Sequence, residues 1–244
     1  MTSLSVNVNK FALLRNSRGR DYPSVVGMAR RAIGAGVQGI TVHPRPDERH
    51  IRRSDVPELS SLVGAHKNVE FNIEGYPTRD FLDLVVEVGP DQCTLVPDAP
   101  DQLTSDHGWK LEAHGDTLVP IIDRLKTAEI RVSLFLDPVG DDIDRASAVG
   151  TDRIEFYTEP YAEAFGTGAE DSEWKRFADG AAYAREVGLG VNAGHDLNLD
   201  NLPRFLTIPR ILEVSIGHAI VVESFDHGFE ETLRRYLAII QAGV

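Results

Sequence analysis

Three side chains able to exchange protons stand at the ends of short apolar stretches, far apart along the chain. They are His43, Glu74 and His195. In a parallel α/β protein, reacting groups lie where strands end and loops begin. A carboxylate that is desolvated at such a place has its pKa raised towards neutrality, and an imidazole opposite it can act as the acid. We therefore predict a proton-transfer site made of these residues.

A metal site formed by the same side chains is the alternative chemistry, because histidine and carboxylate ligands suit zinc. No short His-x-x-x-His pairing supports it, so proton transfer is favoured and no metal ion is expected. Polar residues also collect at strand ends simply because strands meet solvent there. That structural interpretation suits Asn9 and Tyr157, but it fits poorly with two imidazoles and a carboxylate on separate strands.

Eight apolar stretches alternate with amphipathic ones at near-regular spacing, which favours a parallel sheet closed into a barrel. We predict an α/β fold of the TIM (β/α)8 barrel type, as a single domain over residues 1–244. The open doubly wound sheet is the alternative, but its Gly-rich turn is absent after the first strand. The expected strands cover 4–9, 39–43, 69–74, 92–97, 130–137, 153–158, 188–197 and 211–216.

The expected helices lie between these strands. They cover 21–35, a segment from 54, 78–88, 116–128, 141–149, 171–187, a segment from 200, and a last one from 223 or 229 to 242. Two longer polar loops, 98–115 and 159–170, have the length and position of lids.

The composition is that of an ordinary globular protein, with 42% hydrophobic and 26% charged residues. The single cysteine, Cys93, excludes an intramolecular disulfide and a cysteine-rich metal site. A net charge of −13 argues against nucleic-acid binding, which needs a positive field. The sequence shows no signal peptide and no stretch apolar enough to span a membrane, so we expect a cytoplasmic protein without a membrane partner.

Two basic segments follow expected strands, 14–20 and 43–51, and both contain several arginines. Arginine matches the geometry of phosphate, although charge runs are usually solvated turns. A third segment, 215–219, follows the last strand, where barrels often bind phosphate on backbone amides. Together the three segments predict small phosphorylated substrates.

These residues resemble the pyridoxine 5′-phosphate synthase family, and the resemblance covers essentially the whole chain. The matching segments are 6–7, 15–19, 39–43, Arg45, Asp47, 49–51, 72–74, 95–97, 132–137, 154–155, 191–195 and 216–220. The resemblance implies condensation of 3-amino-2-oxopropyl phosphate with 1-deoxy-D-xylulose 5-phosphate into pyridoxine 5′-phosphate, phosphate and water. It also implies no metal, no cofactor, and a homo-oligomer that is an octamer built from dimers.

The resemblance further implies roles for individual residues. His43 and Glu74 would be bases, His195 a proton donor, and Glu155 a further carboxylate that assists the proton transfers. The residues that would hold the aminoketone phosphate are Asn7, Arg18, Gly217 and His218. Those that would hold the deoxyxylulose phosphate are Arg45, His50 and Thr104.

The chain departs from the family pattern around the substrates. Asn9 and Lys10 stand where the family has an Asp-His pair that contacts the deoxyxylulose phosphate. Asp196 replaces a glycine that binds the aminoketone phosphate. The other departures are Pro46, Glu159 and the turn 221–224. The proton-transfer residues are therefore kept while the binding shell differs. The alternatives are a paralogue acting on another small carbonyl compound and, less favoured, a barrel that binds phosphorylated ligands without turnover.

Overall fold

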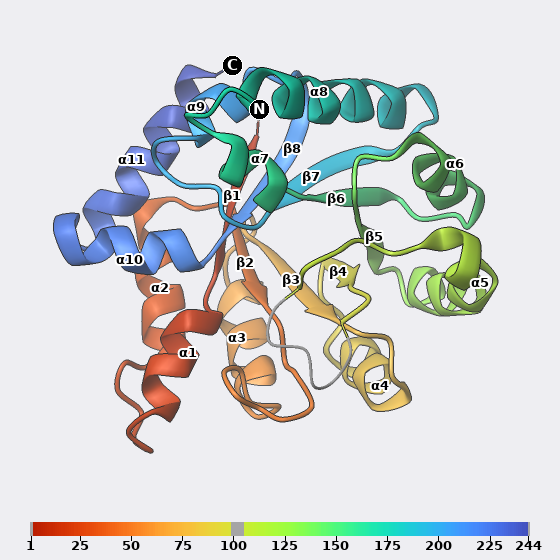
Figure 1. Cartoon of the computed structure of the whole chain (residues 1–244). Helices are drawn as coiled ribbons and strands as arrows, with labels where there is room; N and C mark the ends of the chain where they lie inside the picture. The colour runs from red at the N-terminus through yellow and green to blue at the C-terminus, as the bar shows by residue number, and fades with distance from the viewer. Residues whose placement is uncertain (1, 99–104, 244) are drawn as a thin grey trace.

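The computed structural model of the chain describes residues 2–98 and 105–243. Its centre is a closed barrel of parallel strands in sequence order, in which the last strand pairs with the first (Figure 1). The barrel expected from the sequence is therefore confirmed. The strands are β1 (Ser3–Asn7), β2 (Gly39–Val42), β3 (Glu70–Gly75), β4 (Gln92–Leu95), β5 (Arg131–Leu136), β6 (Arg153–Tyr157), β7 (Gly190–Gly194) and β8 (Ile211–Ile216).

Helices surround the barrel and cover the outward faces of its strands (Figure 1). Those close to the expected positions are α2 (Val25–Ala35), α3 (Asp55–Gly64), α4 (Arg79–Val88), α5 (Leu111–Thr127), α6 (Gly140–Ala148), α8 (Glu170–Glu186), α9 (Leu202–Phe205) and α11 (Phe229–Ala242). The structure adds α1 (Asn9–Asn16), α7 (Glu159–Ala164) and α10 (His218–His227). Within the described ranges, no helix is both long and apolar enough to cross a membrane.

Side-chain caps explain where two of the helices begin. The Thr78 hydroxyl accepts a hydrogen bond from the Phe81 amide at 3.2 Å, which confirms the predicted N-cap of α4. The helix expected over 21–35 starts only at Val25. The Ser24 hydroxyl accepts a hydrogen bond from the Gly27 amide at 3.3 Å, so Ser24 is the N-cap of α2. The expected helix start at 116 is likewise wrong, since α5 already begins at Leu111.

The segments expected to be basic or polar loops are partly helical. Residues 9–16 form α1, whose Arg15 is buried and pairs with Asp55 at 2.6 Å. Arg15 also donates to the backbone oxygen of His50, so α1 is fixed to the loop after β2. A helix this short, with few apolar residues in register, depends on such tertiary contacts and gives little periodic signal.

The inside of the barrel is polar, whereas the outward faces of the strands are apolar. Hydrogen bonds between side chains on non-adjacent strands cross the interior, such as Thr94 to Glu155 at 3.5 Å and Asn192 to Gln92 at 3.4 Å. Leu4 and other apolar residues alternate with these positions and pack beneath the helices. The expectation of nearly continuous apolar strands is therefore met only on the outward faces.

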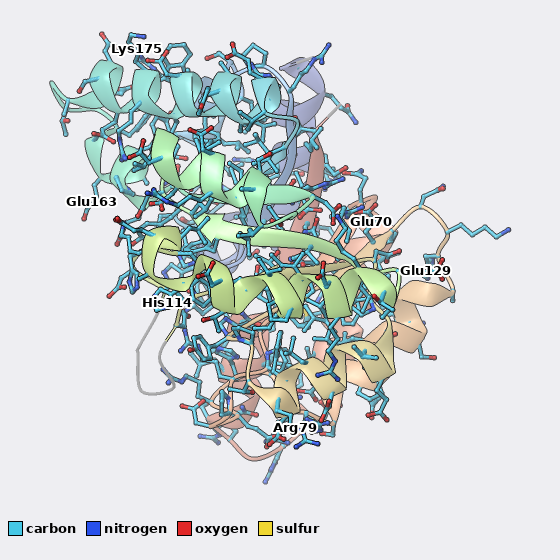
Figure 2. The ribbon with its side chains drawn as sticks, turned by 90° about the vertical axis from the view of Figure 1, so that its right-hand side faces the viewer. Glu70, Arg79, His114, Glu129, Glu163 and Lys175 are labelled. Atoms are coloured by element: carbon cyan, nitrogen blue, oxygen red, sulfur yellow. The ribbon has the colours of Figure 1, made fainter. Side chains whose placement is uncertain are left out.

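The two ends of the barrel differ. Figure 2 shows the molecule from the side, with Glu70 and Glu129 at the end where strands begin and Glu163 at the end where they finish. At the beginning end, Arg131 pairs with Glu70 and donates to Gln92 at 2.9 Å. The predicted proton-transfer residues belong to the opposite end.

Candidate active site

The three predicted proton-transfer residues lie at the same rim of the barrel. His43 follows β2, Glu74 is near the end of β3, and His195 follows β7. The charge of Arg45 acts on the pKa of all three side chains. Because electrostatic effects of this kind fall with distance, the three residues surround one common neighbourhood. All three therefore share the rim, but of the three only His43 lines the cavity described below.

His43 is held as a neutral imidazole. Its backbone amide donates to the Asn9 side-chain oxygen at 2.9 Å, which ties the end of β2 to the start of α1. Burial lowers the pKa of His43 well below its ordinary value, and the positive charge of Arg45 lowers it further. At neutral pH the ring is therefore able to accept a proton.

Glu74 is held so that a proton binds it readily. The Asn7 side-chain amide donates to its carboxylate at 3.4 Å. Asn7 is the last residue of β1, which β2 separates from β3. Burial raises the pKa of Glu74 well above its ordinary value, and the nearby carboxylates Glu155 and Asp98 raise it further. A buried carboxyl group whose pKa is raised binds a proton more readily than an ordinary one, as a general acid–base group requires.

His195 occupies a constrained position between aromatic rings. Its ring lies 5.3 Å from the ring centres of both Phe135 and Tyr157, and it meets each edge to face. The Thr158 hydroxyl donates to the backbone oxygens of Gly194 and His195 and so holds the end of β7. His195 has a φ of 81°, in the left-handed region that non-glycine residues seldom adopt. Backbone strain of this kind collects at functional sites.

Glu155 lies inside the barrel beneath the rim, where it is 2% exposed. Thr94 donates to it at 3.5 Å. A Cβ atom at Gly194 would stand 2.4 Å from the Glu155 carboxylate, so only glycine permits this close approach. Burial raises the pKa of Glu155 to about 8, with a further contribution from Glu213.

Glu213 is a buried carboxylate that the sequence analysis did not single out. It accepts from Gln92 at 3.5 Å and from Asn192 at 3.4 Å, and burial raises its pKa to about 7. The available signal was a polar residue at the same inward position of several strands. This pattern is not visible in any one strand, because a single polar residue within an apolar strand does not by itself indicate a functional site.

The buried carboxyl groups predict a loss of stability at alkaline pH. Glu155 binds its proton with a pKa of about 8 when folded and 4.5 when unfolded, so the stabilisation is complete below pH 4.5 and lost as pH rises through 8. Between pH 6 and 8.5 the unfolding free energy of Glu155→Gln should therefore fall by about 2 kcal/mol less than that of the unchanged protein. Urea unfolding at several pH values measures it, with the exposed Glu129→Gln as control. An unchanged slope would contradict a raised pKa.

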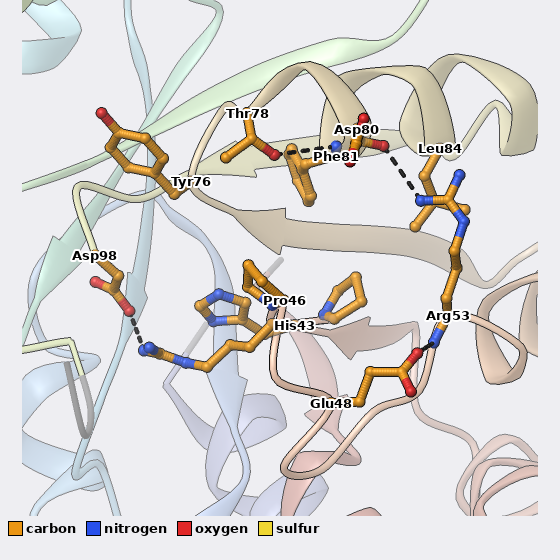
Figure 3. A pocket seen from close by; sticks show the side chains of 12 residues that line it. His43, Pro46, Glu48, Arg53, Tyr76, Thr78, Asp80, Phe81, Leu84 and Asp98 are labelled. Carbon is orange, nitrogen blue, oxygen red and sulfur yellow. Dashed lines mark hydrogen bonds and ion pairs between the residues drawn. The ribbon is translucent and has the colours of Figure 1, made fainter. Parts of the chain in front are cut away.

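A cavity of about 420 Å³ opens beside His43 (Figure 3). Its lining includes Arg45, which belongs to the predicted phosphate-binding segment 43–51 and is 5% exposed. Arg45 forms an ion pair there with Asp98, which lies outside the predicted segments. The remaining lining combines apolar and polar side chains, namely Pro44, Pro46, Glu48, Arg53, Tyr76, Thr78, Asp80, Phe81 and Leu84.

His50 lies near this cavity, with its ring centre 6.0 Å from that of His43. The Ile51 amide donates to Nδ1 of His50 at 2.9 Å, so the neutral ring carries its hydrogen on Nε2. Burial lowers the pKa of His50 to about 4, and Arg45 lowers it further. His50 is therefore a neutral hydrogen-bond donor at physiological pH.

A second cavity of about 450 Å³ lies beyond β7 and β8 and is lined largely by acidic side chains. Asp196 and His218 face it, and α10 begins at His218, so a helix N-terminus stands beside it. A Cβ atom at Gly217 would come within 3.0 Å of the Asn7 Cβ, which explains the glycine there. The other lining residues are Glu159, Ala162, Glu163, Asn198, Ala219, Val222 and Glu223.

The remaining predicted residues lie further out. Lys10 is in the first turn of α1, and its charge lowers the pKa of His50 and of His195. Arg18 is exposed in the turn after α1 and lines neither of the two cavities. Thr104 falls outside the described residues. Within residues 2–98 and 105–243, no three His, Cys, Asp or Glu side chains are grouped so that they could hold a metal ion.

Comparison with known proteins places this geometry in a family. The model of the pyridoxal phosphate biosynthesis protein PdxJ family matches residues 4–242. Pyridoxine 5′-phosphate synthase of Xanthomonas campestris pv. campestris (strain B100) is 53% identical over 250 residues, covering 99% of this chain and 97% of the relative. The synthase of Chelativorans sp. (strain BNC1) is 48% identical over 244 residues, covering 98% of each chain.

Among solved structures, KGPDC from Streptococcus mutans superposes with a TM-score of 0.68 at 12% identity, covering 99% of this chain and 98% of that one. At that identity the likeness concerns the barrel fold alone. The family match and the two relatives extend over almost the entire chain, and they include every segment that forms the rim. The chain therefore belongs to the pyridoxal phosphate biosynthesis protein PdxJ family.

Proposed function

We propose that this chain is a pyridoxine 5′-phosphate synthase, which condenses 3-amino-2-oxopropyl phosphate with 1-deoxy-D-xylulose 5-phosphate. The products are pyridoxine 5′-phosphate, inorganic phosphate and water. Family membership supports the reaction. The observation that carries the proposal is the common rim, where neutral His43, a readily protonated Glu74 and His195 surround one charged neighbourhood.

The chemistry of the condensation consists of proton transfers on phosphorylated carbonyl compounds. Imine formation and dehydration each require a proton to leave nitrogen or carbon and another to reach the oxygen that departs as water. Ring closure requires a proton to reach the carbonyl oxygen, which becomes a hydroxyl group. In the proposed mechanism His43 and Glu74 accept protons, and the ring N–H of His195 donates to the departing oxygen. Glu155, beneath the rim, exchanges protons with this set through its raised pKa of about 8. Holding both substrates in one site makes these steps effectively unimolecular.

The two cavities support separate places for the two substrates. We propose that Arg45 and the Nε2–H of His50 bind the phosphate of 1-deoxy-D-xylulose 5-phosphate, beside the 420 Å³ cavity. The aminoketone phosphate would then meet Asn7, Gly217 and the amides at the start of α10, where a helix N-terminus favours anions. The proposed roles of Arg18 and Thr104 rest on the family resemblance alone.

We further propose one domain over residues 1–244, a cytoplasmic location and a homo-oligomer, by resemblance an octamer. Exposed apolar side chains on two helices that contact each other support an oligomer. Leu13 and Leu14 of α1 are 42% and 43% exposed, and Phe225 of α10 is 78% exposed. Light scattering measures the mass in solution, and a monomer of 26.9 kDa would contradict the oligomer.

The proposed reaction is tested by giving the purified protein both phosphorylated substrates. We expect release of inorganic phosphate together with a product that has the absorbance of pyridoxine. Each substrate alone should give neither signal. A well-folded sample that forms no pyridoxine compound would contradict the proposed function.

Asp196 favours a second candidate, a paralogue that uses the same proton transfers on a carbonyl compound with one phosphate. Its side chain adds negative charge to a cavity that already contains Glu159, Glu163 and Glu223. A phosphate bound there would be repelled. A related amine without that phosphate would not be repelled by these carboxylates.

The replacement Asp196→Gly measures this effect. Residue 196 has a φ of 58°, which glycine adopts without strain, so the variant should fold at least as well. If charge repulsion acts, the KM for 3-amino-2-oxopropyl phosphate should fall about tenfold. Asp196→Asn keeps the side chain and removes only the charge, so it separates repulsion from backbone strain. An unchanged KM in both variants would mean that Asp196 does not act on the phosphate.

A further inference from the structure

Asp98 stands in direct contact with Arg45 at the edge of the 420 Å³ cavity. The two side chains form a buried ion pair, with side-chain exposures of 2% and 5% (Figure 3). Asp98 follows the end of β4, whereas Arg45 belongs to the loop after β2, so the pair joins two separate loops of the rim. Neither the family resemblance nor the comparisons assign a role to Asp98.

The carboxylate of Asp98 is satisfied on one side only. Its Oδ2 receives both the Arg45 guanidinium and the Ser105 hydroxyl, the latter at 2.7 Å. Its Oδ1 is buried and has no hydrogen-bond partner among the described residues. A buried acceptor without a partner destabilises the arrangement that holds it.

Asp98 gives the buried guanidinium of Arg45 a counter-charge, and a buried cation that loses such a charge is strongly destabilising. A phosphate that entered the cavity would offer that counter-charge with better geometry than one carboxylate oxygen. The same phosphate would be repelled by the Asp98 carboxylate as long as it stayed in place. Phosphate and Asp98 therefore compete for one guanidinium.

We infer that Asp98 is a positioning residue that pairs with Arg45 before a phosphorylated ligand binds and is displaced from it when that ligand binds. Asp98 thereby lowers the affinity for phosphate at this place. It also sets the selectivity of the cavity, since a neutral or singly charged ligand does not displace it as effectively. The inference rests on the proposed function only for naming that ligand as the phosphorylated ketose.

The test measures binding of inorganic phosphate to the full-length protein by calorimetry. Asp98→Asn removes the competing charge, so phosphate should bind about tenfold more tightly than to the unchanged protein. Asp80→Asn is the matched control, because Asp80 lines the same cavity but is exposed, and its backbone oxygen accepts a hydrogen bond from Arg53. Its affinity for phosphate should change by less than twofold. In steady state, Asp98→Asn should also lower the KM for the phosphorylated ketose.

Phosphate binding that is unchanged or weaker in a folded Asp98→Asn protein would overturn the inference, since Asp98 would then orient Arg45 for phosphate. If that variant does not fold, Ser105→Ala decides the question. It removes the 2.7 Å hydrogen bond to Asp98 without touching Arg45, so phosphate should bind about threefold more tightly. Unchanged or weaker binding there would also overturn it. Tighter phosphate binding in a protein that makes no pyridoxine compound would keep this inference and refute the proposed function.

Discussion

Replacing Glu74 by glutamine should lower kcat for pyridoxine 5′-phosphate formation by about a thousandfold, the usual scale for removing a general acid–base group. Glutamine has nearly the same shape and still accepts the hydrogen bond from Asn7, but it cannot take up a proton. Burial and the nearby carboxylates Glu155 and Asp98 raise the pKa of Glu74, so the substitution removes a carboxyl group that is suited to proton exchange. Steady-state kinetics with both substrates measure the change.

The control for this variant is Glu87→Gln, which changes an exposed carboxylate on α4, the helix that follows the same strand. Its kcat should equal that of the unchanged protein. The far-ultraviolet spectrum and phosphate binding of Glu74→Gln should also be unchanged, because the substitution removes no packing. Full activity in a folded Glu74→Gln protein would remove Glu74 from the mechanism.

The replacement His43→Gln should lower kcat by a similar factor of about a thousand, with little change in phosphate binding. His43 is neutral in the folded protein because burial and Arg45 lower its pKa well below 6.5. A base with a lowered pKa stays unprotonated as the pH falls, so kcat of the unchanged protein should show no decline near pH 6.5 caused by this residue. Rate measurements from pH 5 to 8 report both effects.

His66→Gln serves as the matched control. His66 is exposed in the turn between α3 and the start of β3, at the end of the barrel opposite the rim, so this change should have no effect on kcat. A fall in activity of the unchanged protein with a midpoint at pH 6.5, absent from the His43 variant, would mean that His43 keeps its ordinary pKa. That result would contradict the neutral imidazole at the rim.

The departures from the family pattern have clearer meanings once the contacts are known. Asn9 still serves the site, because its side-chain oxygen accepts from the His43 amide at 2.9 Å. Lys10 adds a positive charge that acts on both His50 and His195. Asp196, in contrast, faces an acidic cavity. The changes near His43 are therefore compatible with phosphate binding. The changes that oppose it are the carboxylates Glu159, Asp196 and Glu223, which all line the second cavity.

Some of the site could not be predicted because its signals are not periodic. Glu155 was predicted, but Glu213 was not. The two carboxylates influence each other only because the strands close into a barrel, which brings β6 and β8 within reach of β4. Asp98 looked like the start of a polar loop, and nothing local to it indicated Arg45, which lies 53 residues away. Helix α1 was missed because contacts with Asp55 and His50, rather than amphipathicity, stabilise it.

The sequence by itself predicted the barrel, which the structure confirms, and the residues that we propose for proton transfer. Alternating apolar strands and amphipathic helices permit few parallel folds, and reactive side chains at strand ends must share one rim once the sheet closes. Tertiary structure alone decided the protonation of His43 and Glu74, the pairing of Arg45 with Asp98, and the left-handed backbone at His195. The reason is that desolvation, charge pairing and backbone strain depend on distances between residues far apart in the chain, which no local pattern contains.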